Sequence, residues 1–107
     1  MVEKFFTPKE ANQILPTVKA IVAEIISKAY EPGGEARIKA LMAQLEDMGC
    51  YYKDWNFEIG LVDFPAIIHG QEALLCWRSD EPVVEWFHGY DDGYAGRRKI
   101  TRELIFS

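Results

Sequence analysis

The chain has 107 residues, which is the length of one ordinary domain, so a single domain spanning residues 1–107 is expected. Its formal net charge of −5 excludes a general attraction to nucleic acid or to an anionic membrane surface. No stretch approaches the roughly 20 apolar residues that span a bilayer, and the N-terminus lacks the pattern of a signal peptide. We therefore expect a cytoplasmic protein that binds neither a membrane nor nucleic acid.

The first half of the sequence predicts two helices joined by a short turn. Residues 7–10 (Thr-Pro-Lys-Glu) are typical of a helix start, with a capping threonine, a proline that suits the first turn and a glutamate that completes a capping box. Apolar residues then recur at helical spacing toward Tyr30, where residues 31–34 (Glu-Pro-Gly-Gly) break the pattern. A second helix is expected from about residue 35 to residue 48.

The apolar stripe of the first helix is wider than one partner helix needs. A second copy of the chain is the simplest cover, which predicts a homodimer through the helices; alternatively, the sheet covers the spare face. Pro16 is expected to kink this helix near Asn12 without ending it, because proline removes one backbone hydrogen bond and crowds the preceding turn.

After Gly49 the apolar pattern changes to that of strands. Strands are expected at residues 50–53, 61–68, 72–78 and 83–88, with an edge or a bulge at Pro65 and an ambiguous last segment at residues 100–107. Short turns between them indicate an antiparallel meander. Strict alternation places Val84, Trp86 and His88 on one face.

The predicted fold class is therefore α+β. An antiparallel helical hairpin, about residues 7–48, packs on a small C-terminal antiparallel sheet, about residues 50–107. The two cysteines, Cys50 and Cys76, lie far apart without a CxxC motif, so we expect buried free thiols and neither a disulfide nor a zinc site.

Most of the chemically versatile side chains lie in residues 88–98, which we call the signature loop. Glycines allow close approach of a ligand to the backbone, and guanidinium groups beside them suit a phosphate or a carboxylate. The candidate ligand-binding residues are Trp86, His88, Asp91, Asp92, Gly93, Gly96, Arg97 and Arg98. The alternative is a tight loop whose arginines are solvated or paired with its aspartates.

His88, Asp91 and Asp92 are also candidate ligands for a divalent metal ion, and His88 is a candidate acid–base catalyst. Three ligands are few for such a site, so Asp63, Glu85 or Asp54 would have to be brought in by the fold. The alternative is a histidine that ends a strand and bonds to a neighbouring backbone group or aspartate.

Three groups of residues carry a resemblance to a known family. They are Phe6-Thr7 with Glu10-Ala11-Asn12 and Leu15-Pro16; Gly60 to Ala66; and Leu75 to Arg78 with Glu81-Pro82, Trp86, His88 and Gly93 to Arg97. Together they resemble the opening, the central motif and the C-terminal signature of the bacterial and archaeal domain-of-unknown-function family 2203. The resemblance covers nearly the whole chain. It strengthens the predicted fold and the choice of residues, but it implies no activity.

Three functional hypotheses follow. The first is a small binding module that holds an anion or a nucleotide-like ligand in the signature loop. The second is a metal-assisted hydrolase that uses His88 with Asp91 or Asp92. The third is a structural homo-oligomer or a protein-partner module, in which the loop only locks the fold.

Overall fold

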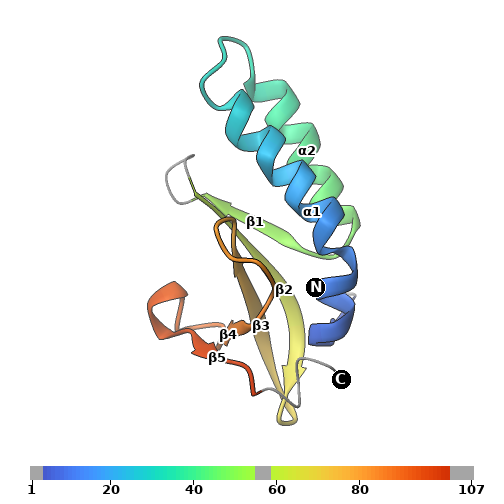
Figure 1. The fold of residues 1–107 in the computed structure, drawn as a ribbon, viewed down its shortest axis with the longest axis vertical. Helices are drawn as coiled ribbons and strands as arrows, with labels where there is room; N and C mark the ends of the chain where they lie inside the picture. The colour runs from blue at the N-terminus through green and yellow to red at the C-terminus, as the bar shows by residue number, and fades with distance from the viewer. Residues whose placement is uncertain (1–3, 55–58, 102–107) are drawn as a thin grey trace.

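The computed structural model of the chain describes residues 4–54 and 59–101, and it has two helices followed by a five-stranded antiparallel sheet (Figure 1). The elements are α1 (Pro8–Lys28), α2 (Glu35–Asp47), β1 (Tyr51–Asp54), β2 (Gly60–Ile68), β3 (Gln71–Arg78), β4 (Trp86–His88) and β5 (Arg98–Lys99). The predicted α+β class is confirmed. Neither of the helices in the described part is long and apolar enough to cross a membrane.

The start of α1 follows from its capping box. The Glu10 backbone N–H donates to the Thr7 hydroxyl at 3.1 Å, and the Thr7 N–H donates to the Glu10 carboxylate at 2.9 Å. Both bonds satisfy donors that the first turn of a helix leaves without a partner. The helix then continues through Pro16 to Lys28, as expected.

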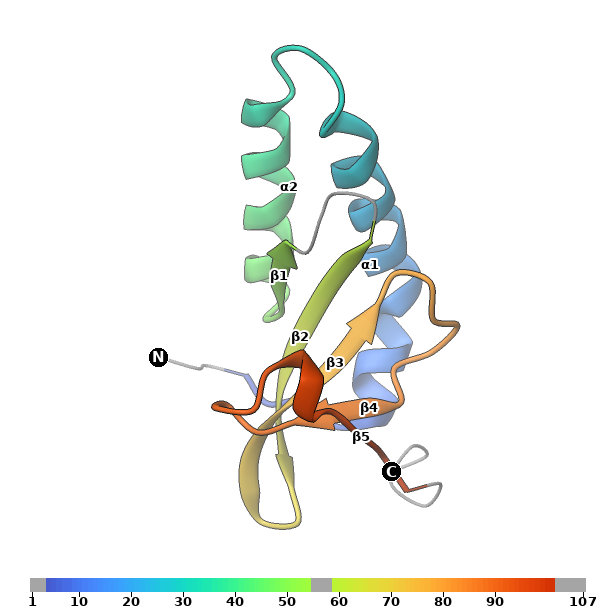
Figure 2. The same ribbon diagram turned by 90° about the vertical axis from the view of Figure 1, so that its left-hand side faces the viewer.

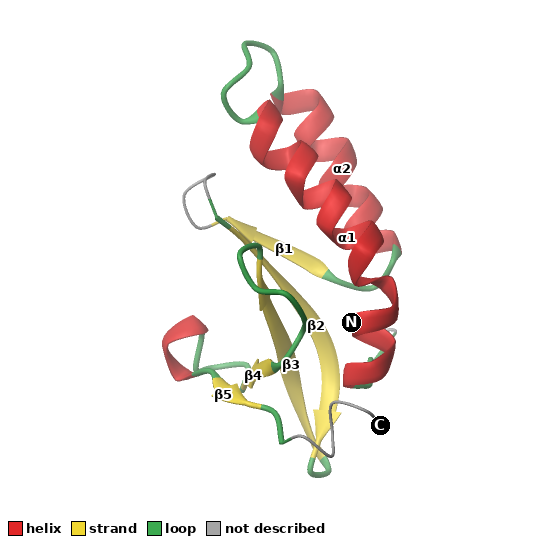
Figure 3. Cartoon of the chain, viewed as in Figure 1, coloured by secondary structure: helices red, strands yellow, loops and turns green. Residues whose placement is uncertain are grey.

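The two helices lie side by side against one face of the sheet, and the opposite face carries the signature loop (Figures 2 and 3). One core joins the helices to the sheet through Val18, Ile25 and Leu41 on the helices and Phe64 and Trp77 on the strands. The sheet therefore covers the side of α1 for which a second copy was the simplest expectation.

The sheet is a meander in the order β1-β2-β3-β4-β5, with every neighbouring pair antiparallel. Pro65 lies inside β2, beyond the point where β1 stops pairing. Its carbonyl accepts from the N–H of Phe6 at 2.7 Å, so it points away from β3. The proline nitrogen points to the same side, at an edge where a missing N–H costs no sheet hydrogen bond.

β4 is shorter than predicted, because its expected first half bonds to α1 instead of to a strand. The Asn12 side chain accepts from the Val84 N–H at 2.8 Å and donates to the Val84 carbonyl at 3.0 Å. Val84 is fully buried in the helix-side core, so the predicted placement of Val84 on the same face as His88 is wrong. This contact fixes the connection between β3 and β4, residues 79–85.

The end of the chain is described only to residue 101. Ile100 is buried in the helix-side core, and its N–H donates to the Glu85 carbonyl at 2.8 Å. The remainder of the ambiguous segment, residues 102–107, lies outside the described residues.

Replacing Asn12 by alanine should lower the free energy of unfolding by about 2 kcal/mol, because a buried backbone donor and acceptor lose their partner. Gln13→Ala, an exposed change on the next residue, should shift it by less than about 0.5 kcal/mol. Urea unfolding of the two variants measures the difference. Equal stabilities would show that the Asn12 contact does not fix residues 79–85.

Candidate functional site

His88 ends β4 on the face of the sheet that turns away from the helices. Its ring is buried, with 2% of the residue exposed. Nδ1 lies 2.8 Å from the Gly89 carbonyl, and Nε2 lies 3.3 Å from Oδ1 of Asp63. A carbonyl only accepts hydrogen bonds, so Nδ1 carries a proton and donates it to the Gly89 carbonyl. The other ring nitrogen, Nε2, makes the contact with Asp63.

The cross-strand register brings a second and a third side chain to His88. Asp63 on β2 pairs with Cys76 on β3, which in turn pairs with Trp86, two residues before His88 on β4. One possible ligand atom from each of Asp63, Cys76 and His88 lies within 4.8 Å of the others. In the described part of the chain, this is the one group of three such side chains gathered closely enough to hold a metal ion.

Lys53 on β1 brings a positive charge to this cluster. Its Nζ lies 2.9 Å from Oδ2 of Asp63, while its own side chain is about half exposed. The ammonium group is close but poorly aligned, so Oδ2 has a neighbouring charge and no hydrogen-bond partner. A buried carboxylate oxygen in this state costs free energy that a better-placed cation would recover.

The Cys76 thiol is not prepared for nucleophilic attack. Burial, and then the negative charge of Asp63, raise its pKa to about 12, so the thiol is protonated near neutral pH. A base would have to take this proton, yet both ring nitrogens of His88 face oxygen atoms. The arrangement therefore does not match a Cys–His nucleophile pair.

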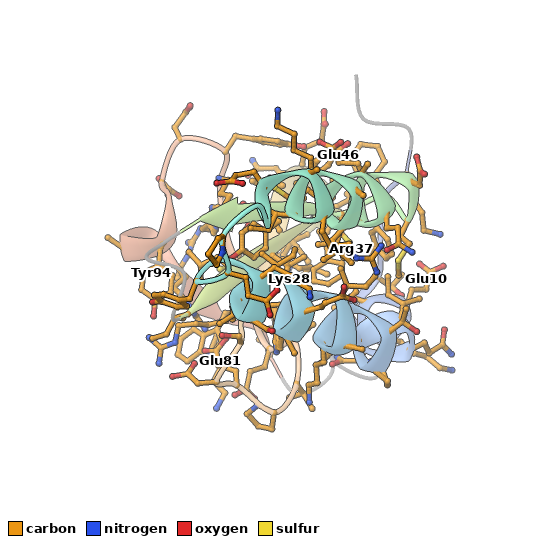
Figure 4. The ribbon with its side chains drawn as sticks, turned by 90° about the horizontal axis from the view of Figure 1, so that it is seen from above. Glu10, Lys28, Arg37, Glu46, Glu81 and Tyr94 are labelled. Carbon is orange, nitrogen blue, oxygen red and sulfur yellow. The ribbon has the colours of Figure 1, made fainter. Side chains whose placement is uncertain are left out.

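Arg97 is engaged in holding the signature loop. Its guanidinium donates a short hydrogen bond to the Glu81 carboxylate, and both side chains are largely buried. The same guanidinium lies 4.5 Å from the Trp86 ring centre and 4.8 Å from that of Tyr94. Glu81 and Tyr94 lie on the same side of the molecule (Figure 4). These contacts support the hypothesis that this part of the loop locks the fold.

Asp91 and Asp92 do not join the His88 cluster, although sequence reasoning had grouped the three as metal ligands. The Asp92 carboxylate accepts from the Gly89 N–H at 3.2 Å, and Asp91 is exposed. A Cβ placed on Gly96 would lie 2.7 Å from Cβ of Asp92, so the folded loop needs glycine there. Gly93 has a φ of +64°, which turns the chain in a way that favours glycine.

Arg98, the last residue of the loop and the first of β5, contributes to a second, separate place. It borders a pocket of about 160 Å³, together with Ile68, His69, Gln71, Glu72, Ala73, Phe87 and Gly89. Its guanidinium carbon lies 5.1 Å from the Phe87 ring centre, and none of the ion pairs within the described residues includes Arg98. Phe87 and Ala73 pack toward the helices, so this pocket is on the opposite face of the sheet from His88.

Sequence reasoning missed Cys76 as a member of the polar cluster and named Asp63 only as a residue that the fold would have to supply. A signal for Asp63 was present, because it is the one charged residue in the otherwise apolar strand β2. Cys76 gave no comparable signal, since a buried cysteine alone is ordinary.

Residues 32–100 match the family model of an uncharacterized conserved protein, domain of unknown function 2203. This stretch is more than half of the chain. The chain belongs to that family. The matched stretch contains the polar cluster, Arg97 and Arg98, so the family model covers both places described above. No curated protein matches the chain, and no solved structure does.

Removing the Arg97 side chain should lower the free energy of unfolding by about 3 kcal/mol, because Glu81 would remain as a largely buried charge without its partner. Arg98→Ala removes the same charge from the neighbouring, exposed residue and should cost less than about 0.5 kcal/mol. Denaturant unfolding of both variants gives the comparison. Similar losses for the two would mean that the Arg97 ion pair does not hold the loop.

Proposed function

We propose that this member of the family is a small binding module whose ligand is a small anion held at the Arg98 pocket. The observation that carries the proposal is the pocket itself, which combines a guanidinium without an ion pair among the described residues and the apolar side chains of Ile68, Ala73 and Phe87. A guanidinium supplies two parallel donors to a carboxylate or a phosphate, and an apolar surface beside it strengthens that attraction.

The size of the pocket limits the ligand. Its volume of about 160 Å³ is well below the range of about 300–1,000 Å³ that is typical of sites for drug-sized molecules. A whole nucleotide is therefore a poor candidate, and a small carboxylate or a single phosphate group is a better one. Glu72 lines the same pocket, so a ligand with one negative charge is favoured over a doubly charged one.

The other members of the signature loop support this site indirectly. Arg97 is held by Glu81, and Asp92 closes the turn onto Gly89. These contacts favour an architectural role for the inner part of the loop, which leads the chain to β5 and so presents Arg98 at the pocket. The structural and binding hypotheses therefore apply to different residues of one loop.

Small anions should raise the thermal unfolding midpoint of the wild-type protein, when acetate, formate and phosphate are each compared with sodium chloride of equal ionic strength. A ligand at a hundred times its dissociation constant adds about 2.7 kcal/mol. Arg98→Ala should abolish the rise, whereas Lys99→Ala, which removes a charge from the next residue outside the pocket, should keep it. A rise that is the same in both variants, or no rise with any of these anions, would contradict the proposal.

Association into a homodimer through the helices and a cytoplasmic location stay predictions. The wide apolar stripe of α1 motivates the first, although much of that stripe is buried within one chain. Sedimentation at micromolar concentration measures the mass in solution, and a single species with the mass of one chain would contradict the dimer.

A further inference from the structure

The polar cluster on the second face of the sheet has a role that the anion pocket does not explain. Asp63, Cys76 and His88 come from three adjacent strands, and they are exposed by only 2%, 1% and 2%. Buried side chains of this kind need partners, and their potential ligand atoms all lie within 4.8 Å of one another. We propose that these three residues bind one divalent transition metal ion of the zinc class. This site is independent of the anion pocket.

The hydrogen bonds of the His88 ring are those of a metal ligand. Nδ1 donates to the Gly89 carbonyl at 2.8 Å, and this bond fixes the tautomer in which a neutral ring has its lone pair on Nε2. Metal-binding histidines commonly use one nitrogen for the ion and give the other to a carbonyl or a carboxylate. Here the free lone pair points to Asp63, where two electron-rich atoms would repel each other without a cation between them.

The distance between Nε2 of His88 and Oδ1 of Asp63 fits a shared ion and is longer than that of the usual ion pair between these groups. A protonated histidine bonded to a carboxylate is expected at about 2.7–2.9 Å, whereas Nε2 and Oδ1 are 3.3 Å apart. Two ligands about 2.0–2.1 Å from one tetrahedral ion lie roughly 3.3 Å from each other. The three potential ligand atoms lie within 4.8 Å of one another, so the Cys76 sulfur has to move closer by about 1 Å to reach the same ion.

Charge balance also supports a divalent ion. An Asp63 carboxylate and a Cys76 thiolate carry two negative charges, which one divalent ion neutralises among buried side chains. A metal ion bound by Cys76 would replace the proton of the thiol. Metal binding would thus give these buried polar atoms partners and leave the site without net charge.

The ligand types select the class of metal. Magnesium and calcium prefer sites made of oxygen atoms, whereas a set with one sulfur, one nitrogen and one oxygen suits zinc or cobalt. Three protein ligands leave a position of a tetrahedral ion for water or another small ligand. That open position is typical of zinc sites that are not purely structural.

Lys53 both competes with the ion and indicates its entry route. Its ammonium group lies 2.9 Å from Oδ2 of Asp63, and it is the half-exposed member of an otherwise buried set. An ion approaching from the β1 side would displace Lys53 from the carboxylate. Removing this charge while keeping the apolar stem should therefore strengthen metal binding.

The test is a titration of untagged, metal-free protein with Zn²⁺ against a chromophoric chelator, repeated with Co²⁺ as a coloured probe. The wild-type protein should bind one ion per chain, with the absorption of a thiolate bound to cobalt. Asp63→Asn, Cys76→Ala and His88→Gln should each weaken binding by more than about 100-fold, the upper range for residues that only support a ligand. Lys53→Met should bind several-fold more tightly than the wild-type protein.

The chain offers a matched control for each ligand. Cys50 is the other buried cysteine, His69 is the other histidine, and Asp92 is a loop aspartate that is not part of the cluster. Cys50→Ser, His69→Gln and Asp92→Asn should keep wild-type affinity. Equal affinity in Cys76→Ala and Cys50→Ser, or no binding of one ion per chain, would overturn the proposal. If a ligand variant does not fold, a Lys53→Met affinity no tighter than wild type also overturns it.

Discussion

The ion pair between Arg97 and Glu81 is the interaction on which the second face of the sheet depends. It joins the end of the signature loop to the connection between β3 and β4, and Trp86 and Tyr94 flank the guanidinium. Because both side chains are largely buried, the attraction between the two charges is offset by the hydration that they have lost. The ion pair therefore contributes more to the placement of the loop than to the net free energy of unfolding. The geometry is a loop held over three buried polar side chains.

The two faces of the sheet therefore differ in chemistry. Toward the helices it presents an apolar surface made of residues such as Phe64 and Leu75, which α1 and α2 cover. On the other face the same strands present Asp63 and Cys76, and the cover is a loop instead of a helix. A loop can close over polar groups because its own backbone supplies donors and acceptors, as the Gly89 carbonyl does for His88.

Much of the fold follows from local patterns in the sequence, while the site depends on register. The capping box at Thr7 and the apolar run of β2 specify their elements almost alone. The start of β4 could not be predicted in this way, because Asn12, which is 72 residues away, binds the backbone of Val84. His88 was identifiable from its chemistry, but its neighbours were not. Pairing across three strands decides that they are Asp63 and Cys76, and the turn from Gly89 to Asp92 leaves the loop aspartates outside the cluster.

The long reach of Asn12 has a consequence for the order of folding. The helical hairpin and the meander join neighbours in sequence, so most of their contacts close short loops and form quickly. The link from α1 to Val84 closes a loop of 72 residues. The entropy lost in closing this loop is smaller once the helical hairpin and the meander have already formed. Its contribution would then be absent from the rate-limiting barrier, so it retards unfolding without accelerating folding.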